Sequence, residues 1–259
     1  MHKTSTPFWQ KPSTLFYLFF GCYVIAWTLA PTLIRHVTPM DATEGSMWAL
    51  KMQWGYPRDP WLNALLTKIA LWLFHDHDMG IYFFSQLMAL MAAYGCFRLG
   101  RIILKNDYAA LIAAVSLTAM QYFNVGIIDF NDNGCLLGLW PMMFYYFYQA
   151  CHRQKFKDWM LLGLFAGLGV MAKYYTLIPL LCMLAYLIFE KSKHALWKDY
   201  RLYLATAIMA LMSLGHIIWL FKYDFIPFNF ILGVLNRGAQ PSFYQQHFGY
   251  ALHFTTSQL

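Results

Sequence analysis

The run LFYLFFGCYVIAWTLAPTLI occupies residues 15–34 and contains no charged side chain. A helix needs roughly 20 predominantly apolar residues to cross the hydrocarbon of a bilayer, so this run predicts a membrane-spanning helix. The rest of the chain has the same character, because 59% of its 259 residues are hydrophobic and only 12% are charged. Soluble proteins carry about 25% charged residues. The sequence therefore predicts a membrane protein.

Five further apolar runs follow the first one. They lie at about Ile81 to Leu104, Ala109 to Ile128, Gly134 to Ala150, Trp159 to Phe189 and Leu202 to Phe221. The run from Trp159 to Phe189 is too long for one helix and carries Lys173 at its middle. We interpret it as two short helices that meet at or near Lys173. The predicted fold class is an all-α membrane protein with about seven transmembrane helices.

The positive charges indicate how the chain is oriented. With the N-terminus in the cytoplasm, 12 of the 19 lysines and arginines lie on the inner side, as the positive-inside rule requires. These twelve are Lys3, Lys11, Arg98, Arg101, Lys105, Arg153, Lys155, Lys157, Lys191, Lys193, Lys198 and Arg201. The first run has a basic flank like that of a signal peptide, but its length favours an uncleaved first span.

The segment between the first two spans, residues 35–80, is predicted to form a loop at the outer face. Large apolar residues at helical spacing predict one helix from Asp41 to Trp54 and a second from Trp61 to Phe74. Two amphipathic helices lying along the membrane surface fit this pattern better than a folded domain. We expect one transmembrane domain over residues 1–259, with residues 223–259 at the outer face.

Two acids of this outer loop, Asp41 and Glu44, have two interpretations. Asp-x-x-Glu before an apolar run is the pattern of a capping box, in which the first residue caps the helix and the fourth bonds back to its start. The alternative is a catalytic acid or base. The two roles are compatible, because a cap fixes a carboxylate in position.

A second polar cluster is predicted at the same outer face, between spans three and four. It consists of Asp129, Asn131, Asp132 and Asn133. A polar turn with a helix cap explains the cluster without any function. Ionisable groups at membrane depth are costly, however, and are usually functional.

Several polar residues occur within or beside the later spans. The side chain of Lys173, isolated among apolar residues, either extends to the interface or meets an anionic lipid headgroup. His216 is by default a histidine with satisfied hydrogen bonds, and Lys222 and Asp224 are by default solvated charges at the interface.

Composition and spacing argue against several other classes. The five cysteines form no CxxC pair, so neither a disulfide framework nor a zinc site is predicted. The net charge of +7 comes from bases scattered between apolar runs, which argues against nucleic-acid binding. Acidic residues at an outer site suit a divalent cation, but no ligand spacing demands one, so we assign no metal ligand and no cofactor.

Four stretches in order along the chain carry a family resemblance. They are MDATEGSMWALKMQWGYPRDPWL, FNDNGCLLGLWP, GLGVMAKYYTLIPLL and GHIIWLFKYDFIPF. Together they resemble the integral-membrane GT-C glycosyltransferases of the protein O-mannosyltransferase and aminoarabinose-transferase type, glycosyltransferase family 39. The resemblance covers nearly the whole chain. Relatives commonly continue through further spans, so we expect this chain to be their N-terminal conserved module, either a truncated product or a minimal member.

The resemblance implies transfer of a sugar from a polyprenyl-phosphate donor to an acceptor hydroxyl or phosphate at the outer face of a bacterial inner membrane. It makes Asp41 the candidate general base and Glu44 a supporting acid, because a carboxylate must take the proton as the hydroxyl attacks the anomeric carbon. Lys173, with His216 or Arg237, supplies positive charge for the lipid phosphate. An inverting, single-displacement transfer is also implied.

The remaining polar residues of the outer face are candidates for substrate binding. They are Arg58, Asp129, Asn131, Asp132 and Asn133. Two other functions stay open: a transporter or lipid flippase lined by the same residues, although no repeated halves with broken helices are visible, and an inactive GT-C scaffold. The sequence names neither the sugar, nor the acceptor (lipid A, another glycan or a protein), nor the oligomeric state.

Overall fold

The computed structural model describes residues 10–237 and 248–257. Within these residues the regular secondary structure is helical, apart from an isolated β-bridge between Gly55 and Pro60, which confirms the all-α prediction. The α-helices are α1 (Pro12–Ile34), α2 (Met40–Leu50), α3 (Leu62–Leu73), α4 (Met79–Ile103), α5 (Asp107–Ser116), α6 (Asp132–Arg153), α7 (Phe156–Ala172), α8 (Leu177–Phe189), α9 (Tyr200–Lys222), α10 (Ile226–Arg237) and α11 (Tyr250–Ser257). Short 3-10 helices are η2 (Leu117–Ala119), η3 (Gln121–Phe123), η4 (Gly126–Ile128), η5 (Tyr174–Thr176) and η6 (Lys191–Lys198).

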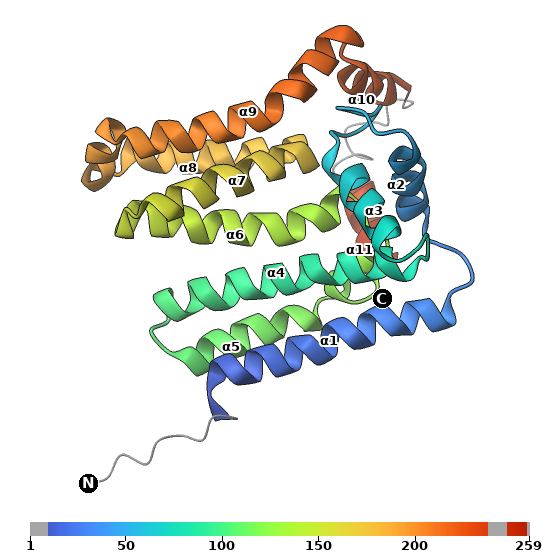
Figure 1. The fold of residues 1–259 in the computed structure, drawn as a ribbon, viewed down its shortest axis with the longest axis horizontal. Coiled ribbons are helices and arrows are strands. Elements are labelled where there is room, and N and C mark those ends of the chain that lie inside the picture. The colour runs from blue at the N-terminus through green and yellow to red at the C-terminus, as the bar shows by residue number, and fades with distance from the viewer. Residues whose placement is uncertain (1–9, 238–247, 258–259) are drawn as a thin grey trace.

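Seven helices form an elongated bundle. In Figure 1, α1 and α4 to α9 run along the long axis, whereas α2, α3, α10 and α11 gather at one end, which we call the α2 end. Neighbouring pairs in the bundle are α1 with α4, α4 with α6, α6 with α7, and α7 with α9. The polar segments between the helices of the α2 end are therefore brought together although they are distant in the sequence.

The helices α1, α4 and α9 are long and apolar enough to cross a membrane, and up to five spans result if each of two bent pairs counts as one. Of the described helices, α6 has the length but begins and ends with charged residues, Asp132 and Arg153. Helices α7 and α8 have 17 and 13 residues because a break divides the long run between them. The chain is a multi-pass membrane protein. By length and composition, the described helices provide three to five spans and not the expected seven.

The predicted break at Lys173 is confirmed. Helix α7 ends at Ala172, and Lys173 has an extended backbone with φ −159° and ψ 141°. The 3-10 helix η5 follows, and α8 begins at Leu177.

The run from Ala109 to Ile128, predicted as one span, is bent by 82° between η2 and η3. Helix α5 ends at Ser116, and three 3-10 turns follow it. Backbone carbonyls freed by such a break need new partners in a membrane. Asn124 Nδ2 provides one of them, donating to the carbonyl oxygen of Thr118 at 2.8 Å.

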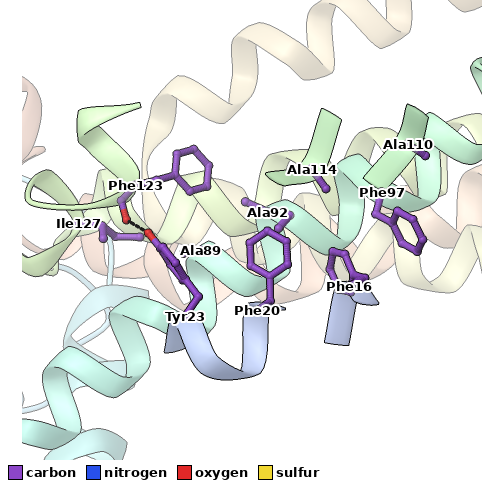
Figure 2. Packing of buried hydrophobic residues seen from close by; sticks show 11 residues of the cluster. Phe16, Phe20, Tyr23, Ala89, Ala92, Phe97, Ala110, Ala114, Phe123 and Ile127 are labelled. Atoms are coloured by element: carbon purple, nitrogen blue, oxygen red, sulfur yellow. Dashed lines mark hydrogen bonds between the residues drawn. The ribbon is translucent and has the colours of Figure 1, made fainter. Parts of the chain in front are cut away.

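Neighbouring helices provide further partners for the bent segment. Tyr23 of α1 donates its hydroxyl to the carbonyl oxygen of Phe123, as Figure 2 shows, and Ser85 of α4 bonds to that of Ile127. Around these bonds lies a core of buried aromatic and alanine side chains from α1, α4 and α5. Packing and hydrogen bonding together hold the bent segment against the bundle.

Helices α2 and α3 confirm the two helices expected within residues 35–80. Helix α2 ends at Leu50 rather than Trp54, because the buried Tyr56 bonds to backbone groups that a longer helix would use. Its hydroxyl donates to the carbonyl oxygen of Trp48 at 3.0 Å and accepts from Gln53 N–H at 3.1 Å. The Trp48 and Tyr56 rings also stack, with centroids 4.8 Å apart.

Candidate active site

The N-terminus of α2 is capped by a residue from a distant segment. Pro39 precedes the helix and offers no side-chain bond. Instead, Asp129 Oδ1 accepts from Ala42 N–H at 2.9 Å. Burial raises the pKa of Asp129, and the backbone N–H groups of Ala42 and Asp41 oppose the rise. The predicted capping box of Asp41 with Glu44 is therefore not formed.

The Asp41 carboxylate is held from the start of α6. Asn131 Nδ2 donates to Asp41 Oδ2 at 2.8 Å. The other atom of the same amide, Asn131 Oδ1, caps α6 by accepting from Gly134 N–H at 3.0 Å. Two bonds thus fix the Asn131 side chain, which confirms the helix cap expected in this cluster and adds a contact to Asp41.

Lys173 reaches the first turn of α6 from the break after α7. Its Nζ forms an ion pair with Asp132 and donates to Asn133 Oδ1 at 2.9 Å. It also lies 5.2 Å from the centroid of the Tyr175 ring. The Lys173 and Asp132 side chains are only 20% and 12% exposed, so both charges are largely removed from solvent. The first turn of α6 therefore links Asp41 on one side to Lys173 on the other.

Glu44 and Arg58 form a separate, more open ion pair. Arg58 Nη1 lies 3.0 Å from Glu44 Oε2, and the two side chains are 43% and 34% exposed. Pairs with this exposure contribute little to stability, typically about 0–1 kcal/mol. The structure places Glu44 beside Arg58, and no hydrogen bond joins Glu44 to Asp41 within the described residues.

Asp59 is a buried acid that sequence reasoning missed. It is 7% exposed, and burial raises its pKa to about 7, with the negative charges of Asp132 and Glu44 adding to the rise. Lys173 and Arg58 oppose it. The only sequence signal was its position in the outer-loop motif, directly after Arg58, and nothing there indicated burial.

His216 is buried behind Lys173's neighbour Tyr174. Its Nδ1 lies 2.6 Å from the carbonyl oxygen of Trp54, and its Nε2 lies 2.8 Å from the Tyr174 hydroxyl. A carbonyl only accepts, so Nδ1 carries the proton and Nε2 accepts from the hydroxyl. Both ring nitrogens are occupied, which matches the satisfied histidine of the default interpretation. His216 connects the outer loop to the residue after Lys173.

Close backbone approach seats the outer loop on α9. A Cβ atom at Gly55 would lie 2.5 Å from Trp219 and 2.8 Å from His216. One at Gly215 would lie 2.6 Å from the Trp54 ring. Glycine at both positions therefore permits the contact that brings Trp54 to His216.

Three other residues predicted at the outer face are Arg237, Lys222 and Asp224. Arg237 is the last residue of α10, and its side chain lies outside the described part of the structure, as do residues 238–247 and 258–259 of the expected outer segment. Lys222 lies 5.5 Å from the Tyr223 ring centroid. Lys173, Asp132 and Asn133 form what we call the Lys173 cluster. Among the residues described, no contact joins Lys222 or Asp224 to it.

An apolar groove begins at the Lys173 cluster and follows one face of α6. Its volume is about 410 Å³. Asn133 lies at its polar end, Leu137, Pro141 and Phe144 continue along α6, and Tyr175 forms part of the wall. The apolar groove therefore begins next to Lys173.

The described residues contain no group of three or more histidine, cysteine, aspartate or glutamate side chains arranged to hold a metal ion. Asp129, Asp41 and Asp132 are engaged by N–H, amide and cationic groups, respectively. The arrangement suits proton transfer at one carboxylate and anion binding at one lysine.

Comparison with known proteins identifies relatives of the chain. A family model described as dolichyl-phosphate-mannose-protein mannosyltransferase matches residues 58–219. The lipopolysaccharide core galacturonosyltransferase RgtA of Rhizobium johnstonii is 25% identical over 208 residues, which cover 78% of this chain and 41% of RgtA. The undecaprenyl phosphate-alpha-4-amino-4-deoxy-L-arabinose arabinosyl transferase of Photorhabdus laumondii is 26% identical over 144 residues, which cover 52% of this chain and 26% of that protein.

The matched regions cover less than half of each of these two bacterial relatives. No solved structure matches it. The family match covers more than half of the chain and includes Arg58, the second polar cluster, Lys173 and His216, while Asp41 precedes it. The resemblance drawn from the four sequence stretches is confirmed, and the chain belongs to the dolichyl-phosphate-mannose-protein mannosyltransferase family.

Proposed function

We propose that the protein moves a sugar from a polyprenyl-phosphate donor to an acceptor hydroxyl or phosphate at the outer face of the bacterial inner membrane. The observation that carries the proposal is the first turn of α6, which links the carboxylate of Asp41 to the ammonium of Lys173 through consecutive residues. A base and a phosphate-binding cation beside each other are what this transfer needs.

In the proposed reaction, the acceptor oxygen bonds to the anomeric carbon while the bond from that carbon to the lipid phosphate breaks. Asp41 takes the acceptor proton, and the leaving phosphate keeps the electron pair and gains a negative charge near Lys173. A single displacement of this kind inverts the anomeric centre. Arg58, Asp132 and Asn133 are proposed to contact the donor or acceptor, with Asp132 also holding Lys173 before the donor binds.

The groove along α6 supports a lipid donor. It is lined by apolar side chains and starts at Asn133, which bonds to Lys173. A polyprenyl chain lying in it would place its phosphate at Lys173, because the lipid and phosphate are covalently joined. His216 is proposed to position Tyr174 and the outer loop, since its ring nitrogens are already occupied.

The proposed membrane arrangement has seven crossing segments and a cytoplasmic N-terminus. Support comes from the alternating direction of the bundle helices in Figure 1 and from the inner excess of positive charge. Helices α2 and α3 then lie at the outer surface within residues 35–80. Residues 1–259 form one transmembrane domain in this arrangement, with residues 223–259 at the outer face.

Mass spectrometry of the polyprenyl-phosphate lipids that co-purify in mild detergent tests the function. We expect an unloaded carrier on the wild-type chain, because transfer consumes the sugar. Asp41→Asn should retain a sugar-loaded carrier, and Lys173→Met should retain little lipid of either kind. Absence of any such carrier from all three proteins would refute the donor. Carrier-dependent lipid movement in proteoliposomes without sugar transfer would instead establish a flippase.

The bond from Asn131 to Asp41 gives a separate prediction. Asn131→Ala should slow sugar transfer by about 10-fold, because Asp41 loses its orienting donor, and should lower the stability by about 1 kcal/mol, because α6 loses its cap. Transfer rate and thermal unfolding are the two measurements.

Asn131→Ser is the matched control. Serine caps a helix about as well as asparagine, but its side chain is too short to reach Asp41 as well. We expect it to restore the stability and not the rate. Recovery of both by serine would show that the bond to Asp41 has no role in transfer.

A further inference from the structure

Asp59 is an acid of the site to which the proposed reaction gives no role. It lies in the loop between α2 and α3, where the bridge between Gly55 and Pro60 and a bond from Tyr56 N–H to the Asp59 carbonyl oxygen, at 3.0 Å, fix the backbone on both sides. The residue is 7% exposed. Its carboxylate has no hydrogen bond or ion pair to any residue that the structure describes.

Charged and titratable groups from several elements surround Asp59. The groups that face it are Glu44 of α2, Arg58 of its own loop, Asp132 and Cys135 of α6, and Lys173 and Tyr174 at the break between α7 and α8. Asp59 thus interacts electrostatically with both ion pairs, Arg58 with Glu44 and Lys173 with Asp132.

The charges of this group do not balance when every acid is ionised. Glu44, Asp59 and Asp132 give three negative charges, against two positive charges from Arg58 and Lys173. The surplus falls on Asp59, because the other two acids have cationic partners and it has none. A phosphate entering beside Lys173 would add another negative charge, and like charges at short range in a poorly solvated site repel strongly.

We propose that Asp59 binds a proton when a phosphate group occupies the site at Lys173, so that phosphate binding and proton uptake are linked. This proposal rests on the proposed function of Lys173. The proton offsets the negative charge that the phosphate adds, so the net charge of the group is the same with the phosphate bound as without it. Burial already raises the pKa of Asp59 to about 7. An anion at Lys173 raises this pKa further, so Asp59 takes up a proton near neutral pH when the phosphate binds. Asp59 is then a positioning residue for the donor phosphate.

Binding of farnesyl methyl phosphate to the full chain in detergent tests the linkage. This probe is a phosphodiester, as the donor is, and it does not titrate near neutral pH, so any pH dependence belongs to the protein. Wild-type affinity should fall about 10-fold from about pH 6 to about pH 8.5, since one linked proton changes affinity by at most about 10-fold for each pH unit. Asp59→Asn should bind as tightly as the wild-type chain does at low pH, with less than about a 2-fold change across the range.

Asp107→Asn is the matched control, since Asp107 forms an exposed ion pair with Arg101 at the other end of the bundle. It should keep the wild-type pH dependence. Calorimetry of the wild-type chain in two buffers of different ionisation enthalpy gives the protons taken up directly, and so does not depend on how well a variant folds. We expect uptake of about half a proton at about pH 7.5, which is what a 10-fold change in affinity implies.

The possible results distinguish failure of the role of Asp59 from failure of the phosphate site at Lys173. A wild-type chain that binds the probe with no pH dependence and no proton uptake would overturn the role of Asp59 and leave the phosphate site intact. The same holds if Asp59→Asn keeps the full pH dependence. Failure of the wild-type chain to bind the probe at any pH would overturn the phosphate site itself, and the linkage with it.

Discussion

An Asp41→Asn variant is expected to transfer sugar about 100-fold or more slowly than the wild-type chain, while still binding the donor. General-base catalysis typically contributes a factor of this size. Asparagine keeps an oxygen that can accept from Asn131 Nδ2, so the contact at 2.8 Å and the cap of α6 survive the substitution. Only the ability to take a proton is lost. Initial rates with the sugar-loaded carrier identified by mass spectrometry are the measurement.

Glu44→Gln is the matched control for this prediction. Glu44 lies on the same helix, but its carboxylate pairs with Arg58 and is partly exposed. Loss of such a pair is worth at most about 1 kcal/mol, so we expect a rate within about 5-fold of the wild type. Equal rates for Asp41→Asn and the wild-type chain would remove Asp41 as the base, and a larger loss for Glu44→Gln than for Asp41→Asn would move that role to Glu44.

Features determined by local composition could be predicted from the sequence. The long run from Trp159 to Phe189 cannot be one span, and a single lysine at its middle marks where the chain leaves the helix, which is where α7 ends. The helices α2 and α3 followed from their apolar spacing. Asn131 as a helix cap followed from a polar turn before an apolar run.

Features determined by contacts between distant segments could not be predicted. The pattern Asp-x-x-Glu resembled a capping box, but Asp129 takes the cap of α2 from a segment 87 residues away, which leaves Asp41 to bond with Asn131. Asp59 looks like any charged loop residue until the loop is seated on α9. The bend after α5 is held in part by hydroxyl groups from α1 and α4, which lie far from the bend in the sequence.

A Lys173→Met variant is expected to bind the donor lipid about 100-fold or more weakly than the wild-type chain. Methionine keeps much of the length and apolar contact of the lysine stem but removes the charge. Truncating one partner of a largely buried charge pair typically costs about 2–5 kcal/mol in binding, which corresponds to a loss of this size. Affinity for farnesyl methyl phosphate and the amount of co-purified carrier are the measurements.

The same substitution also leaves Asp132 without its partner, and an unpaired buried charge destabilises a fold by about 3–5 kcal/mol. Loss of binding by Lys173→Met alone therefore has two explanations, direct contact with the phosphate or damage to the fold. The double variant Lys173→Met with Asp132→Asn separates them, because it removes both charges of the pair. We expect it to recover thermal stability and to stay unable to bind the lipid. If it regained the lipid, Lys173 would be only the structural partner of Asp132, and the phosphate would have to be held by other cations, with Arg58 the first to test.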